Sequence, residues 1–418
     1  MTLPETDIFT SIVARIFRVE EVTLGDPKKG YFLRYRGELT GDSITAYEQL
    51  STALQSYDIT PLFRLEAGRQ TILLVRGTVH PKPGRVSVNI ILFLLTFLSV
   101  LFVGAMNSYS GPMPQDTLGQ IGTLITHLWL GWPFAVSLLA ILLAHEFGHY
   151  FVGRSRGAAV SLPYFIPLPI GILGTMGAFI QLKQLPRNNR ALFDLAIAGP
   201  LAGLVVAIPL LILGLVLSPV EVTQIINFTK TAGTADVCPN SASIGETYTC
   251  PDASLVEGSS LLYLGIKYLV KGEILPSPLH YDLPPLLYWI RYYFTGHPIP
   301  IGGRDVMLDP VAWAAWAGLL VTFLNLIPVG QLDGGHVLYA VFGKRSRYVF
   351  PVILAASLLL TFFWNGWWLW VVLIFLLGRS HAEPLDQITR LDSRRKIMAV
   401  LMLVIFLLVL TPIPYVTF

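Results

Sequence analysis

The sequence His-Glu-Phe-Gly-His at residues 145–149 follows an uncharged, mostly apolar stretch at residues 128–144. On a helix, His145 and His149 lie one turn apart on the same face, so both imidazoles can reach one Zn²⁺ ion. Glu146 lies beside them and has the chemistry of a general base. Ionisable groups inside a bilayer are costly and generally serve a function. This pattern predicts a helix that carries a metal centre within a membrane.

The composition also indicates a membrane protein. Of the 418 residues, 53% are hydrophobic and 13% are charged, whereas about a quarter of the residues of soluble domains are charged. The net charge of +3 is too small to indicate nucleic-acid binding, and the basic residues cluster beside apolar runs instead. We therefore predict an α-helical polytopic protein in a lipid bilayer, without a nucleic-acid partner.

Apolar runs near the length of a bilayer crossing mark the expected transmembrane helices. The run at 348–378 is too long for one crossing, and Trp-Asn-Gly-Trp-Trp at 364–368 predicts a turn between two short helices. We predict about seven spans in all. The expected spans are Val86–Met106, Leu130–Phe151, Leu192–Leu217, Pro310–Ile327, the two halves of 348–378, and Ile397–Leu410.

Basic residues give the expected orientation, because Lys and Arg concentrate on the cytoplasmic side of membrane proteins. With two short helices at 348–378, the basic clusters all fall on one side. We expect a cell inner or plasma membrane, with the N-terminus in the cytoplasm and the C-terminus outside. The basic residues on the expected cytoplasmic side are Arg154, Arg156, Lys183, Arg187, Arg190, Lys344, Arg345, Arg347, Arg379, Arg390, Arg394, Arg395 and Lys396.

Residues 1–85 carry no apolar run long enough to span a bilayer. The alternation of residues at 31–39, 62–66 and 71–78 predicts strands, and the apolar spacing at 44–57 predicts a helix. We therefore expect a small, soluble α+β domain in the cytoplasm. Its residues show no catalytic constellation, so a regulatory or interaction role is the default.

Residues 86–418 are expected to form a membrane-embedded domain, with an extracytoplasmic loop at 218–308. Cys238 and Cys250 both lie in this loop. In an oxidising exterior, two cysteines in one polar segment are expected to form a disulfide. Two unpaired thiols are the alternative.

Two histidines leave a catalytic zinc site one ligand short, because such sites take three protein ligands and keep one position open. Asp333 is the best candidate for the third, within Asn-Leu-Ile-Pro-Val-Gly-Gln-Leu-Asp-Gly-Gly-His at 325–336. The Gly and Pro residues break the helix there, and irregular backbone at that depth is tolerated where it is buried in protein or lines a water-filled cavity. His336 could be a spare ligand or only a packed or solvated side chain.

These motifs resemble those of the site-2 proteases, the family of intramembrane zinc metalloproteases. The resemblance rests on His-Glu-x-x-His at 145–149 and Asn-x-x-Pro-x-x-x-Leu-Asp-Gly at 325–334. It also includes Gly-Thr-Met-Gly-Ala at 174–178 and Phe-Asp-Leu-Ala-Ile-Ala-Gly-Pro at 193–200. The order of soluble head, basic loop and late helical pair is most similar to the chloroplast and cyanobacterial type.

The resemblance implies one Zn²⁺ ion per chain, held by His145, His149 and Asp333. It further implies Glu146 as the general base and Asn325 as a group that positions or polarises the substrate. An Asn near a helix break is about equally often a backbone cap. The implied activity is hydrolysis of peptide bonds within or near the transmembrane segments of single-span membrane proteins, as in regulated intramembrane proteolysis.

Two segments between the motifs have structural interpretations. Prolines and glycines at 161–182 disfavour helix and suit a re-entrant hairpin, whose strand edge could pair with an unwound substrate; a surface loop is the alternative. The small residues from Ala196 to Gly203 predict close helix packing. A metal transporter would need several ionisable groups along a path, and a non-cleaving membrane scaffold would tend to lose Glu146. These two functions are the alternatives to proteolysis.

Overall fold

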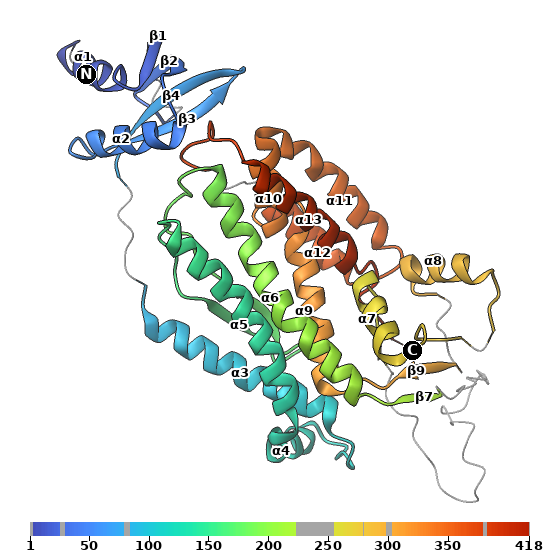
Figure 1. Cartoon of the computed structure of the whole chain (residues 1–418). Helices are drawn as coiled ribbons and strands as arrows, with labels where there is room; N and C mark the ends of the chain where they lie inside the picture. Colours follow the sequence, from blue (N-terminus) through green and yellow to red (C-terminus); the bar gives the residue numbers. More distant parts are fainter. Residues whose placement is uncertain are drawn as a thin grey trace, which may run out of the picture.

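The computed structural model describes residues 3–25, 30–78, 84–222, 255–278, 280–297, 303–378 and 383–417. Most of these residues are helical, and a small sheet lies at one end of the helical bundle (Figure 1). Three helical segments of the described chain are long and apolar enough to cross a membrane, judged by length and composition. They are α3 (Val86–Ser108), η2 with α5 (Leu128–Gly131 and Trp132–Ser155) and α6 (Asn189–Leu217).

The other apolar helices are shorter than a usual bilayer crossing. α9 (Pro310–Leu326) begins at a proline, and the side chain of Asp309 caps its first turn. The predicted break in the apolar run at 348–378 is confirmed, because α11 (Val349–Leu360) and α12 (Trp367–Leu377) are separate helices. α13 (Ser393–Val409) begins four residues before the expected span. The count of seven spans stays a prediction.

The bundle core consists of α5, α6 and α9, which pack against one another and carry most of the large apolar cluster. Small residues allow the close approach. A Cβ atom at Gly148 of α5 would lie 2.6 Å from the carbonyl oxygen of Ala198 on α6. A Cβ atom at Gly318 of α9 would lie 2.8 Å from a methyl carbon of Ile141. The role predicted for the small residues from Ala196 to Gly203 is therefore confirmed, since the α5 and α6 backbones touch there.

The N-terminal residues form a four-stranded antiparallel sheet in the order β1-β2-β4-β3. The strands predicted at 31–39, 62–66 and 71–78 and the helix predicted at 44–57 are present with slightly different ends. α1 and β1 are not predicted by the sequence pattern. The elements are α1 (Leu3–Val13), β1 (Phe17–Leu24), β2 (Leu33–Leu39), α2 (Ser43–Gln55), β3 (Ile59–Glu66) and β4 (Arg69–Arg76).

A loop of the bundle extends this sheet. The segment 383–389, between α12 and α13, runs beside β3, where the amide of Phe63 donates to the carbonyl of Leu385 at 2.9 Å. The amide of Gln387 donates back to the carbonyl of Phe63 at 3.1 Å. The amide of Leu385 also donates to the carbonyl of Pro186, just before α6. Backbone hydrogen bonds therefore join the N-terminal sheet to the bundle.

A β-hairpin is present within residues 161–182, as predicted, and its re-entrant position in the bilayer stays a prediction. β5 (Tyr164–Pro167) and β6 (Thr175–Phe179) pair antiparallel. The hairpin lies along α3, where the Asn89 side chain donates to the carbonyls of residues 162 and 163. The Ser99 hydroxyl donates to the carbonyl of Gly174 at 2.6 Å. Because β6 also contacts α5, the hairpin borders the helix that carries the two histidines.

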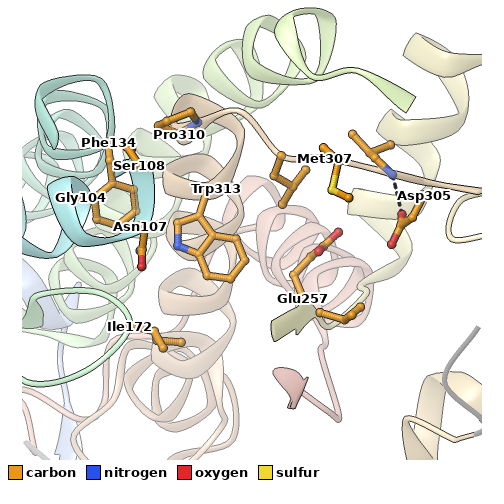
Figure 2. A pocket seen from close by; sticks show the side chains of 13 residues that line it. Gly104, Asn107, Ser108, Phe134, Ile172, Glu257, Asp305, Met307, Pro310 and Trp313 are labelled. Atoms are coloured by element: carbon orange, nitrogen blue, oxygen red, sulfur yellow. Dashed lines mark hydrogen bonds between the residues drawn. The ribbon is translucent and has the colours of Figure 1, made fainter. Parts of the chain in front are cut away.

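The described residues between α6 and α9 lie at the end of the bundle opposite the N-terminal sheet (Figure 1). Lys267 is fully buried there, with its Nζ 2.9 Å from Glu257 and 3.6 Å from Asp305. Both carboxylates line a cavity of about 450 Å³ that Trp313 also borders (Figure 2). Cys238 and Cys250 lie outside the described residues. The remaining helices and strands of the described chain, at either end of the bundle, are α4 (Thr117–Thr126), β7 (Val220–Val222), β8 (Leu255–Glu257), α7 (Leu261–Lys271), α8 (Pro285–Thr295), β9 (Arg304–Val306), α10 (Asp333–Phe342), η3 (Gly343–Tyr348) and β10 (Tyr415–Thr417).

Candidate metal centre

The helix α5 presents His145 and His149 on one face, as their spacing requires. Both side chains are buried, and their Nε2 atoms lie 3.2 Å apart. The Nδ1 atom of His149 donates to the carbonyl oxygen of Leu195 on α6 at 2.8 Å. This hydrogen bond fixes the orientation and tautomer of the ring. The Nε2 atom of His149 is therefore the ring nitrogen with a lone pair for a metal.

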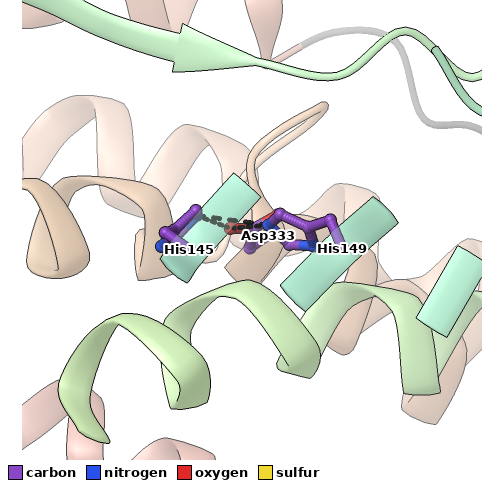
Figure 3. Close-up of side chains that lie close together, drawn as sticks. All are labelled: His145, His149 and Asp333. Atoms are coloured by element: carbon purple, nitrogen blue, oxygen red, sulfur yellow. Dashed lines mark hydrogen bonds and ion pairs between the residues drawn. The ribbon is translucent and has the colours of Figure 1, made fainter. Parts of the chain in front are cut away.

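Asp333 lies between the two imidazoles and comes from a different helix (Figure 3). It is the first residue of α10, and its Oδ2 atom lies 3.3 Å from the Nε2 atom of each histidine. The turn before α10 needs the glycine after Asp333. A Cβ atom at Gly334 would lie 2.0 Å from the carbonyl oxygen of Leu326. The Asp-Gly pair thus allows α10 to start close to the end of α9 and to turn its carboxylate toward α5.

The spacing of these atoms fits a zinc ion. Zn–N and Zn–O bonds of about 2.0–2.1 Å in a tetrahedron place ligand atoms about 3.3 Å apart. The observed separations of the two Nε2 atoms and Oδ2 are 3.2, 3.3 and 3.3 Å. His145, His149 and Asp333 form a group that could hold a metal ion. Two imidazoles and one carboxylate leave the fourth position open, which is the arrangement of catalytic rather than structural zinc sites.

The remaining predicted residues take different places around this group. Glu146 is buried, with 4% of its surface exposed, and directly follows His145 on α5. The side-chain nitrogen of Asn325, near the end of α9, lies 3.3 Å from the Nε2 atom of His145. His336 is not among the three residues that group around the possible metal position. The structure therefore places Asn325 beside the centre.

Two contacts at the centre are not predicted by the sequence analysis. The carbonyl of Leu195 orients His149, and since every residue has a carbonyl, the sequence holds no signal for it. Gly199 lies directly against the His149 ring, where a Cβ atom would come within 2.1 Å of Nε2. The sequence does contain a signal for Gly199, because it belongs to the small-residue run from Ala196 to Gly203. The sequence analysis predicts only helix packing for that run. The absence of a side chain at Gly199 therefore leaves the space that the His149 ring occupies.

The substitution Gly199→Ala is expected to weaken zinc binding by at least about tenfold, because the new methyl group must displace the His149 ring. Gly203→Ala is the matched control on the same helix. A Cβ atom at Gly203 would lie 3.4 Å from Nδ1 of His145, which is ordinary contact. Zinc content of the purified variants, measured by mass spectrometry of the metal, separates the two cases. Equal zinc content in both variants would show that the His149 ring has another position available.

The fold and the site together define a membrane-embedded metalloprotein with a His-Glu-x-x-His helix at its centre. Residues 133–363, more than half of the chain, match the sequence profile of peptidase family M50. The chain belongs to this family, which confirms the resemblance to the site-2 proteases.

Several relatives are named as chloroplastic zinc metalloproteases. The chain is 27% identical over 402 residues to the protein of Oryza sativa subsp. indica named probable zinc metalloprotease EGY2, covering 94% of this chain and 64% of that protein. It is 28% identical over 404 residues to the Arabidopsis thaliana protein of the same name, covering 94% and 62%. The chain thus spans less than two thirds of the length of these relatives. No solved structure matches it.

Proposed function

We propose that this protein is an intramembrane zinc metalloprotease that hydrolyses peptide bonds within or near the transmembrane segments of single-span membrane proteins. The observation that carries the proposal is the convergence of His145, His149 and Asp333 at tetrahedral spacing between apolar helices. Glu146 is buried beside them. Membership of peptidase family M50 and relatives named as zinc metalloproteases support the same activity.

The proposed mechanism gives each residue of the centre a separate task. His145, His149 and Asp333 would hold one zinc ion, which supplies Lewis acidity toward the scissile carbonyl and toward water. Glu146 takes the proton from the attacking water and passes it to the leaving amine. The Leu195 carbonyl keeps the His149 ring in position. Asn325 orients the scissile carbonyl group.

The β5–β6 hairpin is proposed as the platform that receives the substrate. A substrate helix must unwind before its peptide bonds can react, and the freed backbone groups need new partners in the bilayer. A strand edge offers such partners through β-augmentation. Met176 and Phe179 of β6 expose 58% and 50% of their surface, which gives the hairpin apolar contacts for a substrate segment.

We propose the following arrangement in the membrane, which rests on the basic residues and the positive-inside rule. Residues 1–85 form a domain on the basic side, and residues 86–418 form a membrane domain with about seven spans. The loop at 218–308 and the C-terminus lie on the other side. The membrane is a cell inner or plasma membrane, or its counterpart in the chloroplasts of the relatives. The lipid bilayer and single-span proteins are the proposed partners.

One reconstitution experiment separates the proposed function from its alternatives. The full-length protein is placed in lipid vesicles with a single-span reporter protein and an internal zinc-sensitive dye. We expect cleavage of the reporter that stops after treatment with a chelator and returns with added zinc. Zinc entry without cleavage would indicate a transporter. Stable reporter binding without cleavage would indicate a scaffold.

A further inference from the structure

A second cavity, of about 460 Å³, lies where α5 ends and α6 begins. Its size is within the usual range of small-molecule sites, about 300–1,000 Å³. Arginines from three separate parts of the chain converge on it, and α2 of the N-terminal region forms one wall through Ile44 and Glu48. The arginines are Arg154, Arg156, Arg187, Arg190 and Arg395. The lining holds two carboxylates, Glu48 and Asp194, so it carries an excess of three positive charges.

The carboxylate of Asp194 neutralises only part of the positive charge of the five arginines. Arg395 donates to both of its oxygens at 2.7 Å, and Arg156 lies 2.7 Å from one of them. Glu48 lies 3.7 Å from Arg187, and both side chains are more than half exposed, so that pair contributes little. The other arginines contact neutral groups, because Arg154 donates to the Tyr150 hydroxyl and Arg190 to a backbone carbonyl. Positive charge therefore remains available at the cavity.

The orientation of the protein in the membrane does not account for this convergence. The positive-inside rule requires basic residues on one side of the bilayer, and Arg345 and Arg347 on the short helix η3 satisfy it equally well. It does not require guanidinium groups from distant segments to surround one cavity, where they repel one another. A glycine in the turn after α5 also makes room for one of these guanidinium groups. Gly157 has a φ of 71°, and a Cβ atom there would lie 3.1 Å from the guanidinium group of Arg187.

We propose that this cavity binds a phosphate-bearing anion, held by Arg154, Arg187 and Arg190. Arginine presents N–H groups in a planar fork that matches phosphate oxygens. The first turn of the 29-residue helix α6 lies at the same cavity, and the partial positive charge of a helix N-terminus also favours an anion. The cavity lies where the apolar parts of α5 and α6 end, which is the expected depth of lipid headgroups. A phospholipid headgroup and a soluble phosphate compound share the required chemistry.

The test compares two pairs of substitutions that remove equal charge. Arg154→Gln with Arg187→Gln removes two arginines of the cavity and leaves the Asp194 ion pairs intact. Arg345→Gln with Arg347→Gln removes two arginines of η3 from the same predicted side. The full-length proteins, in neutral detergent, are titrated with phosphatidylglycerol and separately with inorganic pyrophosphate. We expect the first pair to raise the apparent Kd of the bound probe by about tenfold or more, and the second pair to leave it unchanged.

The two probes distinguish the source of the phosphate group. Arginine-dependent binding of phosphatidylglycerol alone assigns the cavity to a lipid headgroup, and such binding of pyrophosphate assigns it to a soluble ligand; either result supports the proposal. Binding of neither probe by the unaltered protein overturns it. Equal weakening by the η3 pair also overturns it, since that result reflects general surface charge. If the first pair unfolds, Arg187→Gln alone replaces it, because that side chain is half exposed.

Discussion

The substitution Glu146→Gln is expected to lower the rate of reporter cleavage by about a thousandfold while leaving the zinc content unchanged. Glutamine keeps the size of the side chain but cannot accept the proton of the attacking water. Loss of a general base costs about 10²- to 10⁴-fold in rate. The zinc content should persist because Glu146 is not one of the three grouped residues. Single-turnover cleavage and metal analysis of the same preparation measure both quantities.

Asp333→Ala is the matched comparison for this experiment. It removes one of the three grouped residues, so we expect loss of zinc together with loss of cleavage. Unaltered cleavage by Glu146→Gln would remove Glu146 from the mechanism. Loss of zinc from Glu146→Gln would instead assign its carboxylate to holding the metal. The two variants thus separate proton transfer from metal binding.

The sequence predicts the residues of the centre because their geometry follows from local rules. Helical periodicity places His145 and His149 on one face without any tertiary information. Asp333 is separated from them by nearly 190 residues, and its carboxylate and the helix-breaking Gly and Pro residues around it are what indicate it as a ligand. The distances between the three side chains come only from the packing of α5, α6, α9 and α10.

The contacts that were not predicted depend on tertiary packing. A carbonyl such as that of Leu195 is chemically the same at every position, so the sequence cannot single it out. The five arginines of the second cavity come from three parts of the chain, and the sequence indicates only that they share one side of the membrane. The pairing of segment 383–389 with β3 joins residues more than 300 positions apart. Periodicity does not predict such contacts.

The junction between the N-terminal sheet and the bundle depends on Asp386. Its carboxylate is 1% exposed. It accepts hydrogen bonds from the hydroxyl of Ser43 at 2.7 Å, the amide of Ile388 at 2.8 Å, and both the amide and hydroxyl of Thr389. Its own amide donates to the carbonyl of Arg187 at 2.9 Å. The buried side chain therefore connects α2 with the loop before α13, and the backbone amide of the same residue adds a bond to the segment before α6.

The substitution Asp386→Ala is expected to destabilise this junction by about 3 kcal/mol, because it leaves several buried donors without an acceptor. That free energy corresponds to an increase of about a hundredfold in local opening. Amide hydrogen exchange at Phe63 and Gln387, whose amides bond across the junction, measures the opening directly. Exchange in α5 and α6 should stay slow, because their contacts lie within the bundle core.

Asp42→Ala is the control for an acidic side chain in the same region. Asp42 caps α2 by accepting from the amides of Ile44 and Thr45, and it is exposed. Its loss should speed exchange only in the first turn of α2. If Asp386→Ala leaves exchange at Phe63 and Gln387 unchanged, the backbone pairing alone holds the sheet to the bundle. If exchange in α5 and α6 rises equally, the junction opens only when the bundle itself unfolds, and the N-terminal sheet is an integral part of the membrane domain.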